Sequence, residues 1–398
     1  MKKANNIPEL RFHSFNDSWV TKAGELVFKT ISNKNHNSDL PILAITQEYG
    51  AIPRDLIDFN ISVSEKSIES YKVVEEGDFI ISLRSFQGGI EFSKYRGICS
   101  PAYIILRPTV EIDNDFFKYY LKTPRYIKRL TKNIEGIRDG KMISFKYFSD
   151  AQLTFPSIPE QKRISNLFLV VDKKLMELKK KKYLFEKYKK GILQNIFTKK
   201  IKFKDENGKE FPKWLKSNLG KITIKVGTKN KDNIQYPIYS ISNKKGFINQ
   251  SEQFDGLDSN KRGYDISLYK IVEKNTFAYN PARINVGSIG YSGNLHNIIV
   301  SSLYVCFQTT DDVNDEFLMH YFSTEQFNRA VLNSVEGGVR EYLFYENFSM
   351  IGFELPSYQE QTKIASFLSK IDLKLKSIDQ QIEQTEKYKL GLIQRMFI

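Results

Sequence analysis

Apolar residues recur every three or four positions in two long segments of the chain, and each segment is predicted to be a helix. In the segment that follows Pro156, the recurring apolar residues are Ile164, Phe168, Val171, Leu175, Leu178, Phe185, Tyr188, Ile192 and Ile196. In the segment that follows Pro356, they are Ile364, Leu368, Ile371, Leu375, Ile378, Ile382, Leu392 and Met396. A spacing that averages about 3.5 residues favours a coiled-coil seam between the two helices. Two ordinary amphipathic helices, each packed on its own domain, would give a similar pattern.

The two helical segments are copies of one another, displaced by 200 residues. Between residues 156 and 197, 15 of the 42 aligned positions carry the same residue type without a gap. A repeat this long indicates two fused half-molecules rather than a solenoid. Each copy opens Ser-x-x-Glu, at Ser157 and Ser357, which predicts a capping box at both helix starts. Gly191 and Gly391 predict a kink or an end near the other end of each helix.

The sequence outside the helices predicts two mixed α/β domains, so the expected fold class is α+β. In both domains, short β-rich runs such as PILAIT and SLYVCF precede a helix that begins near Asn114 or Asn314. We expect globular domains at 1–155 and 201–355, and helices at 156–200 and 356–398. The domains differ most in the loop after the middle strand, SLRSFQGG in one and NPARINVGSIG in the other. Divergent loops on a repeated scaffold suit two binding sites of different specificity, although neutral drift would also produce them.

The charge distribution places most of the positive excess on the first helix. The chain has a net charge of +14, and residues 156–200 alone carry 13 basic and 4 acidic side chains. The second globular domain carries 18 of each and is neutral. A solvated helix face explains the lysines at 179–182 as well as phosphate contact does. Nucleic-acid binding by the domains would therefore depend on placed side chains rather than on gross charge.

Composition and motif content favour a non-catalytic, cytoplasmic binding protein. Cys99 and Cys306 are the only cysteines, and their unrelated contexts suit a reducing compartment. No apolar run reaches the roughly 18 residues of a membrane helix, and no apolar core of a signal peptide follows the basic start. The histidines lack metal-ligand spacing, and glycine-rich phosphate or dinucleotide motifs are absent. The run AYNPARI lacks the second proline and the aromatic residue of the adenine-methyltransferase motif. From these missing motifs together we predict no catalytic residues and no metal site.

Six segments of the sequence resemble one known family. They are ELRFHSFNDSW, FPSIPEQKRI, EKYKKGILQ, EFPKWL, ELPSYQEQTKI and EKYKLGLIQ. A helix with an E-Q-x-x-I start after each of two variable globular domains is similar to the specificity subunit of Type I restriction–modification systems. The resemblance covers nearly the whole chain. The first domain lacks an N-P-A-R-I loop, so the two domains are expected to belong to different recognition subfamilies.

The resemblance implies that each globular domain is a target recognition domain for one half of a bipartite, asymmetric site in double-stranded DNA. The helices would pair antiparallel as a spacer, in a pseudo-twofold arrangement, and would dock two modification subunits. Those subunits would hold S-adenosylmethionine and methylate adenine, and restriction subunits with ATP and magnesium would cut the DNA. This chain would hold no cofactor and would not contact a membrane. A stand-alone DNA-binding regulator with a coiled-coil spacer, and a scaffold without a nucleic-acid role, remain alternatives at this point.

Polar and basic residues beside glycines are the candidates for DNA contact, because glycine lets the backbone approach DNA while these side chains reach bases or phosphates. In the first domain they are Arg84, Ser85, Gln87, Arg138 and Lys141. In the second domain they are Arg283, Asn285, Ser288 and Arg340. Any one of them could instead stabilise its loop. The candidates for docking the modification subunits are Gln161, Tyr188, Gln361 and Tyr388.

Overall fold

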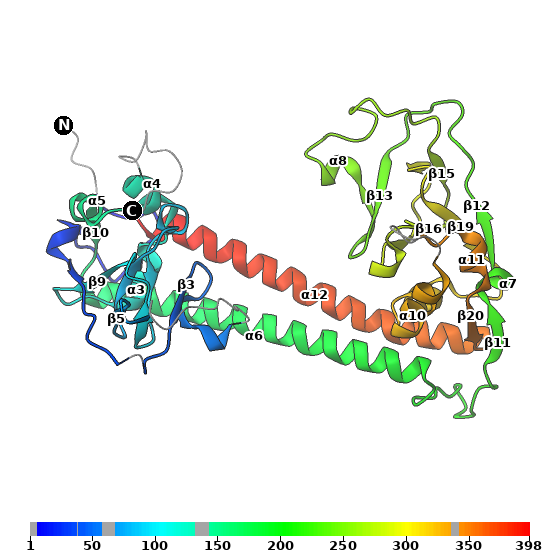
Figure 1. Cartoon of the computed structure of the whole chain (residues 1–398), viewed down its shortest axis with the longest axis horizontal. Helices are drawn as coiled ribbons and strands as arrows, with labels where there is room; N and C mark the ends of the chain where they lie inside the picture. Colours follow the sequence, from blue (N-terminus) through cyan, green and yellow to red (C-terminus); the bar gives the residue numbers. More distant parts are fainter. Residues whose placement is uncertain (1–5, 38, 58–67, 132–142, 336–341) are drawn as a thin grey trace. The chain divides into compact units, whose positions relative to one another are not determined.

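The structure is a computed structural model that describes residues 6–37, 39–57, 68–131, 143–335 and 342–398. Its contacts divide the chain into two compact units, residues up to 179 with 380–398, and residues 180–379. Each unit contains one globular part, the start of one long helix and the end of the other (Figure 1). We call the globular part that precedes the first long helix the first head, and the part between the long helices the second head.

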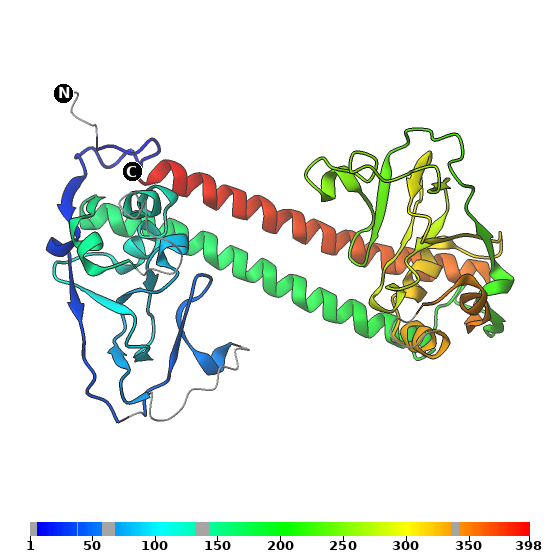
Figure 2. The ribbon, with the colours of Figure 1, turned by 45° about the horizontal axis from the view of Figure 1, so that its top comes forward.

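The first head, coloured blue to cyan in Figure 2, is built around a four-stranded antiparallel sheet with the order β2-β9-β6-β7. Its strands are β2 (Phe28–Ile31), β9 (Ile104–Pro108), β6 (Phe79–Ile81) and β7 (Glu91–Phe92). Three further antiparallel pairs are β1 (Val20–Ala23) with β10 (Gln152–Phe155), β3 (Leu43–Thr46) with β4 (Gly50–Pro53), and β5 (Lys72–Val74) with β8 (Gly97–Cys99). The helices are η1 (Gly24–Leu26), η2 (Arg54–Leu56), α2 (Ser85–Gly88), α3 (Asn114–Tyr120), α4 (Pro124–Thr131) and α5 (Phe145–Asp150).

The second head repeats this architecture, which confirms the predicted internal duplication. Its main sheet has the order β12-β19-β16-β17, formed by Thr223–Val226, Val305–Thr309, Phe277–Tyr279 and Ile289–Tyr291. A second sheet has the order β14-β13-β18-β15, formed by Gly246–Asn249, Ile238–Ser242, Ile298–Val300 and Lys270–Val272. Strands β11 (Leu215–Asn218) and β20 (Gly352–Leu355) pair separately. The helices are α7 (Leu219–Ile222), α8 (Gln250–Gln253), η4 (Ile284–Val286), α9 (Asp315–Phe322), α10 (Glu325–Ser334) and α11 (Tyr345–Met350).

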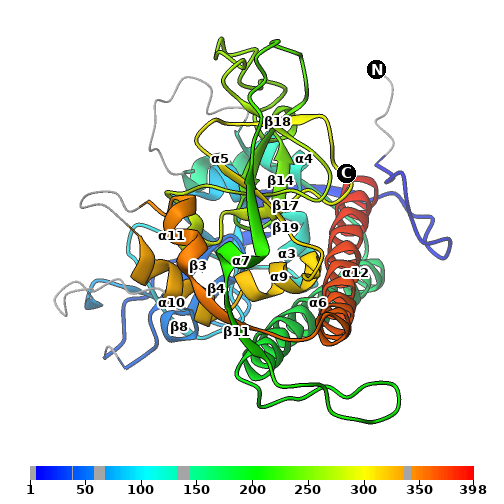
Figure 3. The ribbon, with the colours of Figure 1, turned by 90° about the vertical axis from the view of Figure 1, so that its right-hand side faces the viewer.

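The two long helices are α6 (Ile158–Phe197) and α12 (Tyr358–Met396), and they lie side by side (Figure 3). In the first unit, Lys389 of α12 pairs with Asp172 of α6 over 2.6 Å. In the second unit, Lys189 of α6 pairs with Asp372 of α12 over 2.5 Å. These pairs are the same contact in the two copies. In each, a lysine near the C-terminal end of one helix contacts an aspartate nearer the N-terminal end of the other. The helices therefore pair antiparallel, as predicted.

Most of the predicted apolar seam is buried in both units, but Phe185, Ile192, Leu375 and Ile382 are only half-buried and Tyr188 is exposed. On α6 the buried seam residues are Ile164, Phe168, Val171, Leu175, Leu178 and Ile196, and Leu193, which the pattern did not include, is buried as well. On α12 they are Ile364, Leu368, Ile371, Ile378, Leu392 and Met396. Neither of these helices, nor any other helix in the described ranges, combines the length and the apolar character that crossing a membrane requires.

Two local predictions about these helices hold only in part. Both helices continue past Gly191 and Gly391, so neither glycine ends its helix. The capping box forms only by half: the amide of Glu360 donates to the hydroxyl of Ser357 over 3.4 Å. The carboxylates of Glu160 and Glu360 instead accept hydrogen bonds from Trp19 and Trp214. These indole donors come from the heads, and their approach is a tertiary contact that the local pattern does not contain.

Each head completes its core with residues at the end of the long helix that follows the other head in the chain. In the first unit, Phe397 is 1% exposed just after α12. Its aromatic neighbours, with ring centroids 5.3 to 6.1 Å away, are Phe116, Phe168 and Tyr120. In the second unit, Phe197 ends α6. Its aromatic neighbours, with ring centroids 5.4 to 6.1 Å away, are Phe317, Tyr321 and Trp214. Neither head is therefore complete without the end of the other copy's helix.

A titratable side chain marks one difference between the two copies of this packing. In the first unit, the hydroxyl of Tyr119 donates to Asp172 over 2.6 Å. In the second unit, His320 stands in the matching place, with its Nδ1 4.0 Å from Asp372 and with Lys189 close by. Burial of the imidazole, together with the positive charge of Lys189, lowers the pKa of His320 to about 4, and Asp372 only partly opposes this shift.

We expect the stability of the second unit to fall as the pH drops from 6.5 toward 4. The unfolded chain takes up a proton on His320 near pH 6.5, whereas the folded chain does so only near pH 4. Above pH 6.5 the imidazole is neutral in both states and does not lower the free energy of unfolding. At pH 4.5 this free energy should be lower by roughly 1–3 kcal/mol. Urea unfolding followed by circular dichroism at pH 7.5 and 4.5 measures this loss.

The matched variant is His320→Tyr, which copies the arrangement of Tyr119. Its loss of stability between pH 7.5 and 4.5 should be smaller than that of the wild type, because the carboxylates titrate in both proteins but the imidazole in only one. Equal losses in the two proteins would contradict the role given to His320.

Candidate nucleic-acid interface

In the second head, a hairpin tip and a loop together line an open groove. Strands β13 and β14 are joined by Asn243, Lys244 and Lys245, whose side chains are exposed. The hydroxyl of Ser288 donates to the carbonyl oxygen of Ile241 over 2.9 Å, which ties the loop that contains η4 to the hairpin. The groove measures about 700 Å³, and both segments line it. It is a hollow with lysine and amide side chains at its edge.

In the first head, the matching hairpin joins β3 to β4 and lies against the loop that contains α2. A Cβ added to Gly88 of this loop would come within 2.5 Å of the side chain of Gln47, so the two segments touch. Lys122 holds the tip by donating to the carbonyl oxygen of Gln47 over 2.6 Å and by pairing with Glu91 over 2.6 Å. Burial raises the pKa of Glu91, and the ammonium group of Lys122 opposes this shift.

The two hairpin tips share a backbone shape but differ in chemistry. Each tip ends in a glycine with positive φ, +74° at Gly50 and +64° at Gly246, a conformation that other residues adopt only with strain. The first tip presents Gln47, Glu48 and Tyr49, and all three side chains are exposed. The second tip presents two lysines instead. The same scaffold therefore offers an acidic and aromatic tip in one head and a basic tip in the other.

Two of the predicted contact residues of the first head are exposed. Arg84 and Gln87 are exposed at the start and within α2. The prediction for Ser85 is wrong, because its side chain is 1% exposed and its hydroxyl accepts a hydrogen bond from the amide of Ser82 over 2.8 Å. This side chain stabilises the loop. Two further candidates lie outside the described residues: Arg138 and Lys141.

In the second head, Arg283 and Asn285 are exposed, and Asn285 lines the groove. The prediction for Ser288 is wrong, because this residue is 3% exposed and its hydroxyl donates a hydrogen bond to the carbonyl oxygen of Ile241. Ser288 therefore positions the loop rather than presenting a free hydroxyl. Arg340 lies outside the described residues.

Sequence reasoning missed the hairpin tips as candidate contact residues. The sequence does contain a pattern that indicates these hairpins, because the segments LPILAITQEYGAI and YPIYSISNKKGFI align and each turn ends in a glycine. The lysines at 244 and 245 lie in that turn, next to an apolar strand, which is typical of a projecting hairpin. Only the tertiary contact with the loop of η4 shows that the tip forms one surface with Asn285.

The two glutamines predicted to dock partner subunits are structural residues instead. Gln161 is 1% exposed, accepts from the amide of Asp113 over 2.9 Å and donates to the carbonyl oxygen of Pro156 over 2.8 Å. Gln361 is fully buried and accepts from the amide of Asn314 over 2.8 Å. It also donates to the carbonyl oxygens of Asp312 and Pro356. Both side chains fasten a helix start to its head and leave no surface for a partner.

The two tyrosines predicted to dock partner subunits are open to contact. Tyr188 is 51% exposed and Tyr388 is 56% exposed, at matching positions of α6 and α12. An exposed aromatic ring is a frequent anchor of protein interfaces. Their docking role stays a prediction.

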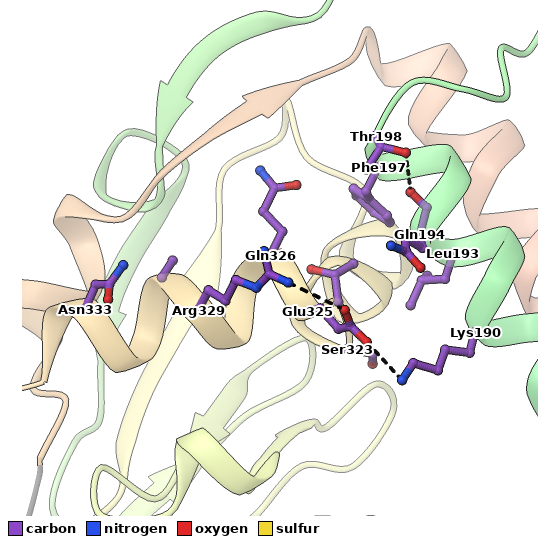
Figure 4. A pocket seen from close by; sticks show the side chains of 12 residues that line it. Lys190, Leu193, Gln194, Phe197, Thr198, Ser323, Glu325, Gln326, Arg329 and Asn333 are labelled. Atoms are coloured by element: carbon purple, nitrogen blue, oxygen red, sulfur yellow. Dashed lines mark hydrogen bonds and ion pairs between the residues drawn. The ribbon is translucent and has the colours of Figure 1, made fainter.

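A pocket of about 470 Å³ lies where the end of α6 meets α10 (Figure 4). Its lining combines apolar side chains such as Leu193 with the ion pair between Lys190 and Glu325, whose atoms lie 2.9 Å apart. Lys190 lowers the pKa of Glu325. Both side chains are about half exposed or more, so the pair contributes little to stability. The apolar contacts around Phe197, rather than this pair, hold the helix end.

Comparison with known proteins gives a consistent result. The model of the Type I restriction modification DNA specificity domain matches the chain twice, over residues 20–186 and 215–387. The Type I restriction enzyme MjaIX specificity subunit of Methanocaldococcus jannaschii is 19% identical over 375 residues, which cover 86% of this chain and 84% of that protein. The MjaX specificity subunit of the same organism is 31% identical over 135 residues, which cover 33% of this chain and 31% of that protein.

A solved structure has the same fold. It is the crystal structure of the S subunit of a Type I restriction–modification system from M. genitalium. The alignment has a TM-score of 0.54 and 15% sequence identity, and it covers 98% of this chain and 99% of that one. At this identity the likeness extends to the fold alone.

We expect Gln361→Leu to destabilise the second unit by about 2 kcal/mol or more, because it leaves buried backbone groups of Pro356, Asp312 and Asn314 without their partner. The matched control is Gln359→Leu, which changes an exposed residue two positions earlier in the same helix. Thermal unfolding of both variants checks the difference. Equal stability of the two variants would contradict the structural role of Gln361.

Proposed function

Because the chain belongs to the Type I restriction modification DNA specificity family and carries its domain twice, we propose that each head recognises one half of a bipartite, asymmetric DNA site. The chain is a specificity subunit with two DNA recognition domains. Nothing in the comparisons favours a stand-alone regulator.

The observation that supports this proposal best is the difference between the two hairpin tips on a common scaffold. Lys244 and Lys245 suit contact with phosphates or guanine, and Asn285 beside them suits adenine. In the first head, Gln47 and Glu48 suit adenine and cytosine. Two surfaces with different donors and acceptors would recognise different half-sites, which makes the complete site asymmetric.

The chemistry is proposed to belong to partner subunits. The chain would not catalyse methyl transfer or cleavage, and it would need no cofactor of its own. S-adenosylmethionine would be bound by the modification subunits, which methylate adenine, and ATP and magnesium by the restriction subunits. We expect this assembly to act on DNA in the cytoplasm.

The long helices are the proposed docking surface for two modification subunits. Tyr188 and Tyr388 are matching exposed residues of the two copies, so each copy offers the same contact once. The buried glutamines at the helix starts are excluded from this role by their hydrogen bonds. One docking surface per copy is the reason to propose two modification subunits rather than one.

The helices are also proposed to set the number of base pairs between the half-sites. An α-helix rises 1.5 Å per residue, so the 40 residues of α6 extend over about 60 Å. One turn of DNA is about 34–36 Å long. A helix of this length is therefore ample for a spacer of about one DNA turn.

We expect Lys244→Ala combined with Lys245→Ala to weaken DNA binding and to reduce its salt dependence. If both lysines neutralise phosphates, the slope of log K against log salt should fall by about 1.8. Fluorescence anisotropy with a duplex that contains the site, at several salt concentrations, measures this change. The matched control is Lys209→Ala with Lys216→Ala, two exposed lysines of the same unit outside the groove. An unchanged slope in the first variant, or an equal loss in the control, would remove the hairpin tip from the interface.

A four-residue insertion after Leu178, matched by one after Ile378, should change the spacing between half-sites and leave the bases recognised unchanged. Four residues add about 6 Å to each helix, close to two base pairs at 3.4 Å each, and nearly complete one helical turn. Mapping of adenine methylation in cells that express the variant with its modification subunit gives the outcome. The purified chain alone should methylate nothing, and transfer of a labelled methyl group by it would refute the non-catalytic proposal.

A further inference from the structure

The first unit contains a buried carboxylate that is fully paired within the chain. Glu160, at the start of α6, is 1% exposed. Both of its oxygens accept hydrogen bonds from the guanidinium of Arg11, each over 2.8 Å. The indole Nε1–H of Trp19 donates to the same carboxylate over 3.4 Å. A two-point guanidinium contact of this kind is among the strongest that a carboxylate makes.

The second unit contains the matching carboxylate and indole but not the arginine. Glu360, at the start of α12, is 5% exposed and accepts from the indole Nε1–H of Trp214 over 3.0 Å. In the part of the chain that the structure describes, no lysine or arginine lies within 4.0 Å of this carboxylate. Instead, Glu360 and Trp214 line a pocket of about 410 Å³. The second unit therefore has the carboxylate and the indole, with an open pocket beside them, but no arginine.

Three lysines line this pocket, Lys199, Lys202 and Lys213, and in the described structure none of them lies within 4.0 Å of the Glu360 carboxylate. Lys202 precedes Phe203 in the chain as Arg11 precedes Phe12, but its ammonium pairs with Glu210 over 3.3 Å. Lys199 pairs with Glu354. Among the acids that line the pocket in the described structure, Glu360 is therefore the one without a cation.

The state of Glu360 is energetically unfavourable for an ionised group. Burial raises its pKa, and the hydrogen bond from Trp214 only partly opposes the shift. A buried carboxylate is stabilised when a cation and further hydrogen bonds satisfy its oxygens. A guanidinium that entered the pocket would supply both, as Arg11 does in the first unit.

We propose that the Glu360 pocket receives an arginine side chain from a partner protein. The occupant is a guanidinium rather than an anion, because a phosphate or carboxylate would be repelled by Glu360. The planar guanidinium also matches a carboxylate that lies beside an indole better than an ammonium does. The identity of the partner rests on the proposed function, in which it is the modification subunit. The two copies would then differ in docking, because the first completes this contact with its own Arg11.

The pocket is tested first with ethylguanidinium as the probe and ethylammonium as its control. The chain has two tryptophans, so its indole N–H region shows two signals, which Trp214→Phe assigns. Ethylguanidinium at millimolar concentration should shift the Trp214 signal saturably and leave the Trp19 signal in place. The shift should be absent with ethylammonium and in Glu360→Gln. A Trp214 signal that does not respond to ethylguanidinium would overturn the proposal.

Arg11→Ala is the positive control, because it creates the same vacancy in the first unit. Ethylguanidinium should now also shift the Trp19 signal and raise the melting temperature of this variant. If the variant does not fold, the wild-type titration still decides the question. A response at Trp19 in Arg11→Ala without one at Trp214 would show that the probe can fill such a site but that the Glu360 pocket does not accept it.

The partner is tested by titrating the purified modification subunit onto the full chain. Glu360→Gln should weaken the association at least tenfold, whereas Glu206→Gln, which removes an exposed charge from the same unit, should not. Equal affinity of Glu360→Gln and the wild type would overturn the assignment of the pocket to this partner. If the wild-type chain itself did not bind the modification subunit, the proposed function would be wrong. The ethylguanidinium titration would still report on the pocket.

Discussion

The structure depends on the burial of two phenylalanines at the ends of the long helices. Phe397 fills the aromatic core of the first head, and Phe197 fills that of the second. Each helix starts beside one head and contributes its last turn to the core of the other head's unit. Folding of either head to completion therefore requires the helix that the other copy provides, and this couples the two halves of the duplicated chain.

The helix starts supply the second constraint. Gln161 and Gln361 satisfy backbone groups that would otherwise be buried without partners, in the same way in both copies. The residues around them differ: Glu160 has a guanidinium partner and Glu360 an open pocket. The contacts that both copies share thus hold the scaffold together. The second copy differs at His320, which makes its stability depend on pH, and at Glu360, whose pocket is open to a partner.

The candidate DNA surfaces follow the same division between shared and individual features. Glycines with positive φ give both hairpins the same turn, and hydrogen bonds from Lys122 to the first hairpin and from Ser288 to the second hold them in place. The side chains at the tips are free to differ, because they are exposed to solvent rather than buried in a core. A rigid frame with variable tips lets each head change the bases that it recognises without changing its fold.

The sequence by itself determined the duplication, the two helices, their apolar seam and the mixed character of the heads, because periodicity and repetition are local properties of a chain. It also pointed to the exposed Arg84, Gln87, Arg283 and Asn285. Only the tertiary structure decided which polar residues stabilise the fold instead of facing a partner. Ser85 and Ser288 lie near glycines and the two glutamines are repeated, but all four side chains are buried and make their hydrogen bonds inside a head. The carboxylates at the helix starts show the same limit. A capping pattern places Glu160 and Glu360 at the right turn, but the indoles that bind them are about 140 residues away in sequence.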